Sequence, residues 1–215
     1  MAFLVFEGLD GAGKSTLISG VENHLKALGQ KVHLTREPGG TPLGEEIRQQ
    51  LLRVEGDTPV PRAEMLLYEA ARAQHVDRVI RPGLAEGKWI LCDRFAPSTV
   101  AFQVGGRGLD RTAIDYLNSY ATDGLLPDLV VLVDLPVEES LARMAKREEK
   151  TGQEKDRFER EERRFHEGVR ASYLQQAKED EQRWLVLDGM KNPEDLLQAL
   201  LMEMEKRGWL ASLTK

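Results

Sequence analysis

The residues with the clearest chemical potential lie directly behind the apolar run 3–6, in a glycine-rich stretch that ends in lysine and serine. Their spacing is Gly8-x-x-x-x-Gly13-Lys14-Ser15, the P-loop pattern. Glycines let successive backbone N–H groups point at phosphate oxygens, and the start of the next helix adds its positive end. The lysine then reaches the β- and γ-phosphates, and the serine hydroxyl can bind Mg²⁺. We therefore expect a nucleoside triphosphate to contact Gly8, Leu9, Asp10, Gly11, Ala12, Gly13, Lys14, Ser15 and Thr16.

A P-loop predicts the nucleotide but not the reaction. A switch GTPase should carry an Asn-Lys-x-Asp stretch after a late strand, and the sequence has none. An ATPase motor or binding module could use Asp134 at the end of the run 129–133, although 215 residues leave little room for a track or a partner. A kinase of a small acceptor would need a second pocket with its own arginines.

A candidate for that second pocket is the pair Asp93 and Arg94, which follows the apolar run 89–92. Ligands of open α/β sheets bind beyond the carboxyl ends of the strands, so this pair should face the P-loop. Asp93 could hold Mg²⁺ or accept a proton, and Arg94 could clamp a phosphate with its planar guanidinium. Taken alone, a surface ion pair of little energetic value is an equally good interpretation.

The residues around this pair extend the pattern. Residues 93–103, DRFAPSTVAFQ, resemble the signature of the thymidylate kinases. Residues 7–14, 35–41 and 67–72 are similar to that family's P-loop, to the loop after its second strand and to its base-binding helix. The four motifs occur in the family's order over essentially the whole chain, and bacterial thymidylate kinases are the nearest match. The resemblance implies an ATP:dTMP phosphotransferase that makes dTDP with Mg²⁺ as its metal.

The resemblance also implies roles for individual residues. Tyr68 and Arg72 lie four apart, on one face of a predicted helix, where they would stack on thymine and donate to its O4. Asp10 would meet the sugar 3′-hydroxyl, and Arg94 with Arg48 would hold the acceptor phosphate. The full dTMP-binding set is Asp10, Pro38, Arg48, Tyr68, Arg72, Arg94, Ser98, Thr99 and Gln103, with Arg36 as a weaker candidate. The catalytic set is Lys14, Asp93, Arg94 and Arg157, and the metal set is Ser15 and Asp93.

A polar stretch around residues 143–164 is expected to form a lid. One group of the family carries an arginine inside the P-loop, whereas the other supplies arginines from the lid. Gly11 and Ala12 occupy that place here, so the lid must contribute. Arg157 best matches the family's lid arginine, and Arg143 and Arg147 are secondary candidates at the ATP site. For most residues of the stretch, a solvated helix is the simpler interpretation.

These residues must be positioned by alternating strands and helices. Apolar runs predict strands at 3–6, 31–35, 89–92, 129–133 and 184–187. Amphipathic stretches predict helices at 15–28, 43–54, 63–86, 110–120, 137–146, 157–178 and 193–206. The alternation indicates an α/β, doubly wound P-loop kinase fold, with a five-stranded parallel sheet flanked by helices on both faces. Residues 1–215 are expected to form a single domain.

Composition limits the partners. The net charge of −6 is unfavourable for binding nucleic acid, and no apolar run reaches the ~20 residues of a membrane span. The single cysteine, Cys92, excludes an internal disulfide and fits a reducing cytoplasm, and we expect no signal peptide. ATP and dTMP are the expected partners, and the resemblance implies a homodimer. The alternatives are a kinase of another nucleotide or nucleoside, and a P-loop ATPase or regulatory binding module.

Overall fold

The computed structural model describes residues 1–152 and 155–210, in which strands and helices alternate as expected. The strands are β1 (Phe3–Glu7), β2 (Val32–Arg36), β3 (Trp89–Asp93), β4 (Leu129–Asp134) and β5 (Trp184–Asp188). The helices are α1 (Lys14–Ala27), α2 (Pro42–Leu52), α3 (Pro61–His75), η1 (Val76–Ile80), α4 (Arg81–Ala85), α5 (Ala96–Thr99), η2 (Val100–Gly106), α6 (Arg111–Thr122), α7 (Val137–Thr151), α8 (Arg163–Glu179) and α9 (Pro193–Lys206). The expected lid range includes residues 153 and 154, which lie outside the described residues.

The five strands form one parallel sheet in the order β2-β3-β1-β4-β5, which confirms the predicted fold class. The central strand β1 pairs with β3 on one side and β4 on the other, so that Val5 lies beside both Cys92 and Val130. From β1 the chain runs to the edge strand β2, returns to β3 beside β1, and then crosses to β4 and β5 on the other side of β1. Ligands bind at such a change of direction, beyond the carboxyl ends of the strands.

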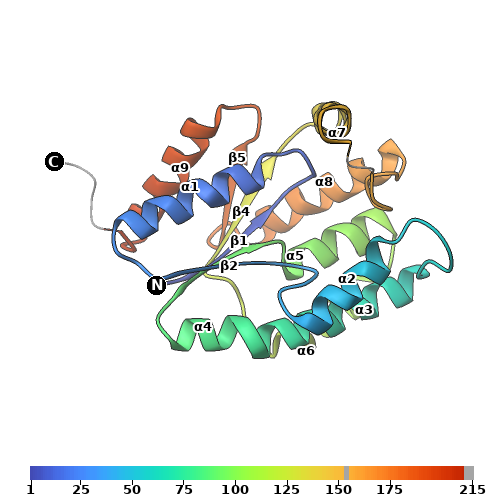
Figure 1. Cartoon of the computed structure of the whole chain (residues 1–215), viewed down its shortest axis with the longest axis horizontal. Helices are drawn as coiled ribbons and strands as arrows, with labels where there is room; N and C mark the ends of the chain where they lie inside the picture. The colour runs from blue at the N-terminus through green and yellow to red at the C-terminus, as the bar shows by residue number, and fades with distance from the viewer. Residues whose placement is uncertain (153–154, 211–215) are drawn as a thin grey trace.

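Alternation along β1 divides the core between two faces of the sheet. Leu4 and Phe6 belong to the apolar cluster that includes α1 and α9, whereas Phe3 and Val5 belong to the cluster that includes Val76. Figure 1 shows α1 and α9 on one side of the sheet and α3, α4 and α6 on the other. Because both faces are covered, the inner strands β1, β3 and β4 are apolar at nearly every position, as buried parallel strands usually are, whereas the edge strand β2 also carries polar residues.

The helices differ from the predicted ranges at three places. The helix expected over 63–86 is a continuous rod of α3, η1 and α4, with a π-helical stretch at Val76–Ile80. Residues 96–106 are also helical, although no helix was predicted there. The helix expected from Arg157 begins only at Arg163. The Asp156 carboxylate accepts hydrogen bonds from the N–H groups of Phe158 and Glu159, which favours a turn at this point.

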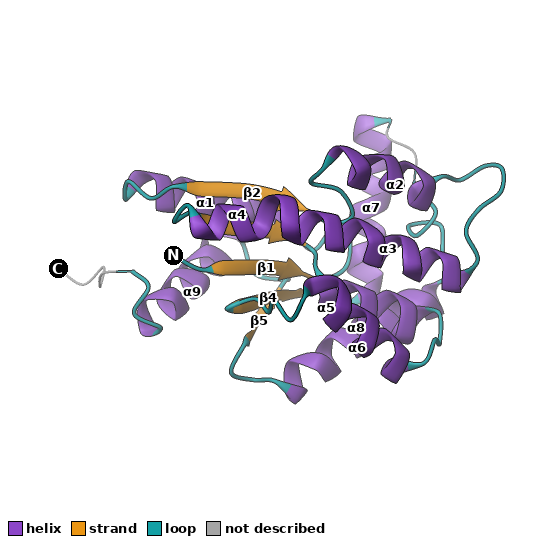
Figure 2. Ribbon diagram, turned by 90° about the horizontal axis from the view of Figure 1, so that it is seen from below, coloured by secondary structure: helices purple, strands orange, loops and turns teal. Residues whose placement is uncertain are grey.

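The carboxyl ends of the strands point toward the end of the molecule where α2, α5, α7 and α8 gather (Figure 2). The P-loop follows β1 at this end, and the Asp93–Arg94 pair follows β3 directly beside it. The fold therefore brings the two sequence motifs to one edge of the sheet. Of the helices within residues 1–152 and 155–210, none is long and apolar enough to cross a membrane.

Candidate active site

The P-loop makes a tight turn between β1 and α1. Gly8, Gly11 and Gly13 all have positive φ angles, of 134°, 78° and 99°, which side-chain-bearing residues rarely adopt. A Cβ atom on Gly8 would lie 2.4 Å from the carbonyl oxygen of Val133, so glycine is also needed there for close approach to β4. The Lys14 side chain is 7% exposed and folds back onto the loop, donating to the carbonyls of Gly8 and Leu9 at 3.1 Å each. These carbonyls hold the ammonium group at the place where phosphates would bind.

A cavity opens over this loop. It is lined by Asp10, Gly11, Gly13, Lys14, Ser15, Thr16, Arg36, Glu37, Arg48, Asp93, Arg94 and Arg147. Five arginine and lysine side chains against three acidic ones give its wall a positive balance, which suits phosphate groups. Among the described residues, Asp93 Oδ1 is buried without a hydrogen-bond partner. That oxygen and the Ser15 hydroxyl are oxygen donors of the kind that Mg²⁺ prefers.

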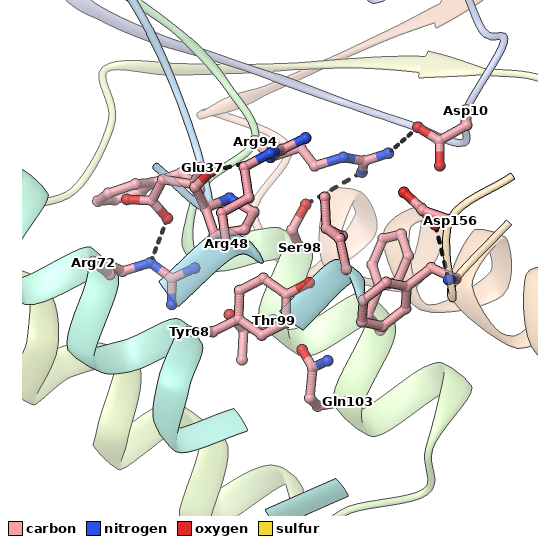
Figure 3. Close-up of a pocket in the computed structure, with 15 residues that line it drawn as sticks. Asp10, Glu37, Arg48, Tyr68, Arg72, Arg94, Ser98, Thr99, Gln103 and Asp156 are labelled. Atoms are coloured by element: carbon pink, nitrogen blue, oxygen red, sulfur yellow. Dashed lines mark hydrogen bonds and ion pairs between the residues drawn. The ribbon is translucent and has the colours of Figure 1, made fainter. Parts of the chain in front are cut away.

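A second cavity lies beside the first and brings together all nine residues predicted to bind the acceptor. It is lined by Asp10, Glu37, Pro38, Arg48, Leu52, Tyr68, Arg72, Arg94, Phe95, Ser98, Thr99, Phe102, Gln103, Asp156 and Phe158 (Figure 3). Aromatic side chains form much of its wall, and the polar groups of Arg72, Thr99 and Gln103 are also there. A flat ring with a polar edge fits such a lining.

Arg72 is fixed at this cavity by three buried acceptors. Its Nε donates to Glu37 at 2.8 Å, and its Nη1 donates to Glu69 at 2.8 Å and to Asn118 at 2.7 Å. The side chain is 1% exposed. Burial alone would lower the pKa of the guanidinium, but Glu37 and Glu69 outweigh it and raise that pKa. Nη2 is the amino group that these three bonds leave for a ligand.

Arg94 joins the two cavities, because it lines both. Its backbone has a φ of 70°, the left-handed region, and its Nη2 donates to Asp10 at 2.8 Å. Burial opposes ionisation of the Asp10 carboxyl, but the charges of Arg94 and Lys14 prevail and lower its pKa to about 2. Arg48 also lines both cavities and donates to the Pro38 carbonyl at 3.0 Å. A phosphate held by these arginines would lie close to the P-loop lysine.

Comparison with known proteins decides between the kinase and module interpretations. The profile of the family described as thymidylate kinase matches residues 6–200. The chain belongs to the thymidylate kinase family. Three curated thymidylate kinases are similar to it over almost their whole length. The protein of Bdellovibrio bacteriovorus is 54% identical over 207 residues, covering 96% of this chain and 97% of its own. Those of Trichlorobacter lovleyi and Geotalea daltonii are 47% and 48% identical, covering 92% and 90% of this chain and 94% and 91% of theirs.

A thymidylate kinase phosphorylates dTMP to dTDP at the expense of ATP, and the family predicted from the four motifs is confirmed. Such an enzyme needs one site for a phosphate donor and one for a phosphate acceptor, and the two adjacent cavities are the candidates for them. Family membership sets aside the ATPase motor and the regulatory module as descriptions of the chain.

The three candidate lid arginines of this thymidylate kinase lie in different places. Arg143 donates to the carbonyls of Gly11 and Gly189, at 3.3 Å and 3.2 Å, beside the P-loop. Arg147 lines the P-loop cavity and is hydrogen-bonded to Glu159. Arg147 therefore lines the cavity predicted to bind ATP, whereas Arg143 lies beside the P-loop but is not among the lining residues, and the ATP-binding role of both stays a prediction.

Arg157, the arginine predicted to be catalytic, lies elsewhere. Its guanidinium forms an ion pair of 2.6 Å with the buried Glu64 and donates to the carbonyl of Leu51 at 3.1 Å. It is not among the residues that line the P-loop cavity. The turn that Asp156 stabilises directs Arg157 toward α2 and α3 rather than along a helix toward the phosphates. Of these two arginines, Arg147 lines the P-loop cavity and Arg157 does not, and a catalytic role for Arg157 stays a prediction.

Several residues of the acceptor cavity were not singled out from the sequence. These are Glu37, Leu52, Phe95, Phe102, Asp156 and Phe158. Glu37 could have been predicted from the sequence, because it lies in the family-like loop 35–41 and a buried arginine such as Arg72 needs a carboxylate partner. Phe158 comes from the expected lid, and its ring centroid lies 6.2 Å from that of Tyr68. The expected lid segment thus supplies Phe158 to the wall of the acceptor cavity and Arg147 to the wall of the P-loop cavity.

Proposed function

We propose that ATP binds over the P-loop and that dTMP binds in the aromatic cavity beside it. An oxygen of the dTMP phosphate then attacks the γ-phosphorus directly, while the bond from the γ-phosphorus to the bridging oxygen breaks and ADP leaves. The observation that carries this proposal is that Arg94 and Arg48 line both cavities, so that a phosphate between them faces Lys14. Catalysis is then positioning and neutralisation of charge, without a covalent intermediate. Lys14, Arg94 and Arg147 supply fixed positive charge around the migrating phosphoryl group.

Ser15 and Asp93 are the residues that would hold Mg²⁺, Asp93 directly or through water. The ion supplies neutralisation of charge on the β- and γ-phosphates and holds them in a reactive orientation. Within residues 1–152 and 155–210, no group of three or more His, Cys, Asp or Glu side chains could hold a metal by itself. That fits a site where phosphate oxygens and water complete the coordination, as is usual for Mg²⁺.

In the acceptor cavity, Tyr68 would stack on the thymine ring, and Arg72, Thr99 and Gln103 would contact its polar edge. Asp10 would bind the sugar 3′-hydroxyl, while Pro38 and Ser98 complete the wall near the sugar and the phosphate. The lid, around residues 143–164, belongs to the same single domain as the rest of the chain in this proposal. Cytoplasmic location is proposed with it, because the substrates are cytoplasmic metabolites and Cys92 is a free thiol.

The exposed faces of α3 and α6 are the surface we propose for a homodimer. The two helices pack side by side, and they carry large exposed apolar side chains at Leu66, Tyr116 and Tyr120, the last of which is 78% exposed. A Tyr116→Glu, Tyr120→Glu double variant should sediment as a monomer if this surface is the interface. An unchanged sedimentation coefficient would place the interface elsewhere or show that the wild type is monomeric.

The proposed reaction is tested by ADP release from ATP and Mg²⁺ with a panel of nucleoside monophosphates. The expected result is release that requires an acceptor and is fastest with dTMP. Lys14→Ala should lower turnover by roughly 10²-fold or more while leaving the unfolding temperature close to wild type. A different best acceptor would identify a kinase of another nucleotide. Near-normal turnover of Lys14→Ala would show that the P-loop is not the donor site.

A further inference from the structure

A fully buried carboxylate lies at the end of β1, immediately before the P-loop. Glu7 accepts hydrogen bonds from the backbone N–H of Phe95 at 2.9 Å, from the Ser98 hydroxyl at 2.6 Å and from the Tyr173 hydroxyl at 2.8 Å. These partners come from the segment after β3, from α5 and from α8. A charged group this deep in a protein is costly unless it is satisfied by such donors.

The Tyr173 hydroxyl connects this carboxylate to Arg94. Arg94 Nη1 donates to the Tyr173 oxygen at 3.0 Å and lies 3.9 Å from Glu7 itself. The Ser98 and Tyr173 oxygens are also 2.8 Å apart, so the single Tyr173 proton points either to Glu7 or to Ser98. In both cases a lone pair of the Tyr173 oxygen remains for Arg94. The hydroxyl is therefore an oriented acceptor for the guanidinium.

The remaining sides of the guanidinium are held as well. Asp10 accepts from Nη2 at 2.8 Å, and the Arg94 Cζ atom lies 5.1 Å from the centroid of the Phe102 ring. Asp10 is the residue proposed to meet the substrate sugar, whereas Glu7 and Tyr173 are absent from the lining of both cavities. They contact Arg94 from outside the lining of both cavities. Burial raises the pKa of Glu7, and the charge of Arg94 and the surrounding donors act in the opposite direction.

A purely structural role does not require these polar groups. Tyr173 belongs to an apolar cluster with Phe165 and Val169, in which a phenylalanine ring would pack equally well. Arg94 in turn has a left-handed backbone, which is unfavourable for a residue other than glycine and must be stabilised by its surroundings. The polar contacts of Glu7 and Tyr173 are thus directed at the Arg94 side chain, which is proposed to bind phosphate.

We infer that Glu7 and Tyr173 are positioning residues, which hold the Arg94 guanidinium in the orientation that receives the dTMP phosphate. The inference rests on the proposed role of Arg94 as a ligand of that phosphate. Tyr173 belongs to α8, the helix that follows the lid segment, so the same contact ties the arginine to the element that carries the lid.

Tyr173→Phe is the decisive variant, because it removes one oxygen atom and leaves the ring in place. Its affinities for dTMP and for thymidine should be compared by titration calorimetry, since thymidine lacks the phosphate that Arg94 would hold. We expect dTMP to bind roughly 10-fold or more weakly, the usual loss for a hydrogen bond to a charged group, and thymidine to bind as in wild type.

Val169→Ala is the matched control for packing, because Val169 is fully buried on the same helix and in the same cluster. It should lower the unfolding temperature without changing the ratio of the two affinities. If Tyr173→Phe weakens dTMP and thymidine equally, or changes neither, the positioning role is refuted.

The variant Arg94→Ala tests the proposed contact between Arg94 and the dTMP phosphate separately from the positioning role of Glu7 and Tyr173. Loss of dTMP but not thymidine affinity in Arg94→Ala supports the phosphate contact itself. If Arg94→Ala shows that loss and Tyr173→Phe does not, Tyr173 is only a packing residue. If Arg94→Ala leaves the ratio unchanged, the proposed role of Arg94 fails and the positioning role with it.

Discussion

Replacing Arg72 with alanine should cost the protein much of its stability. The guanidinium is 1% exposed and pairs at 2.8 Å with both Glu37 and Glu69. Alanine would leave these two buried carboxylates facing each other without the positive charge between them. Breaking a buried pair in this way costs about 3–5 kcal/mol, a large part of the ~5–15 kcal/mol that stabilises a typical protein. For a chain of this size, the loss corresponds to a fall in unfolding temperature of roughly 6–20 °C.

This cost means that thymine recognition is better tested by changing the ligand than by removing Arg72. The monophosphate of 5-methyldeoxycytidine keeps the methyl group and differs from dTMP in the group at position 4 and in the proton at N3. Its amino group would face the Arg72 amino group, donor against donor. An unpaired buried donor costs about 1–3 kcal/mol, so we expect kcat/KM for the wild-type enzyme to be roughly 5- to 150-fold lower than with dTMP.

The two measurements are a thermal unfolding curve for Arg72→Ala and a coupled assay of ADP release for the wild type with each acceptor. Arg62→Ala is a suitable control for stability, because Arg62 is an exposed arginine of the same helix. Equal kcat/KM values for the two acceptors would refute the contact between Arg72 and the base. An unfolding temperature of Arg72→Ala equal to that of the control would refute the account of the buried ion pairs.

The sheet could be predicted from the sequence because strands buried on both faces appear as continuous runs of apolar residues. An inner strand of a doubly covered parallel sheet is buried on both faces and is therefore apolar at successive positions, as in the run 129–133. The grouping of the predicted site residues had a different basis. Strand ends of a parallel sheet meet at one edge and a spacing of four places Tyr68 and Arg72 on one helix face, but the full set was grouped through the resemblance of four motifs to the thymidylate kinases.

Contacts between distant segments have no local sequence pattern that would predict them. The hydrogen bond from Tyr173 to Glu7 joins residues 166 positions apart. In the sequence, Tyr173 looks like any core tyrosine and Glu7 like any surface acid, so neither residue indicates the contact. The predicted start of the helix at Arg157 was wrong for a different reason. Residues 155–178 are rich in helix-forming side chains, but the Asp156 turn delays α8 until Arg163 and sends Arg157 to Glu64. A side-chain–backbone hydrogen bond there outweighs the helical preference of its neighbours.

Two further perturbations test the charges around the P-loop. Because the Asp10 pKa is lowered to about 2 in the folded protein, the stability that its ion pairs contribute is present above pH ~4 and is lost as the pH falls toward 2. Asp10→Asn should therefore unfold at lower urea concentration than wild type at neutral pH, and the difference should shrink between about pH 4 and pH 2; a constant difference would contradict the shift. For the lid, Arg147→Ala should lower kcat by on the order of 10³-fold with ATP affinity changed much less, because an arginine that neutralises the migrating phosphoryl group acts mainly in the transition state. Arg157→Ala should instead lower the unfolding temperature and raise KM for dTMP, because it removes the ion pair of 2.6 Å between the lid and Glu64. Arg160→Ala is the control in the same segment and should leave kcat unchanged. A greater loss of kcat in Arg157→Ala than in Arg147→Ala would mean that Arg157 leaves Glu64 during the reaction and is the catalytic arginine after all.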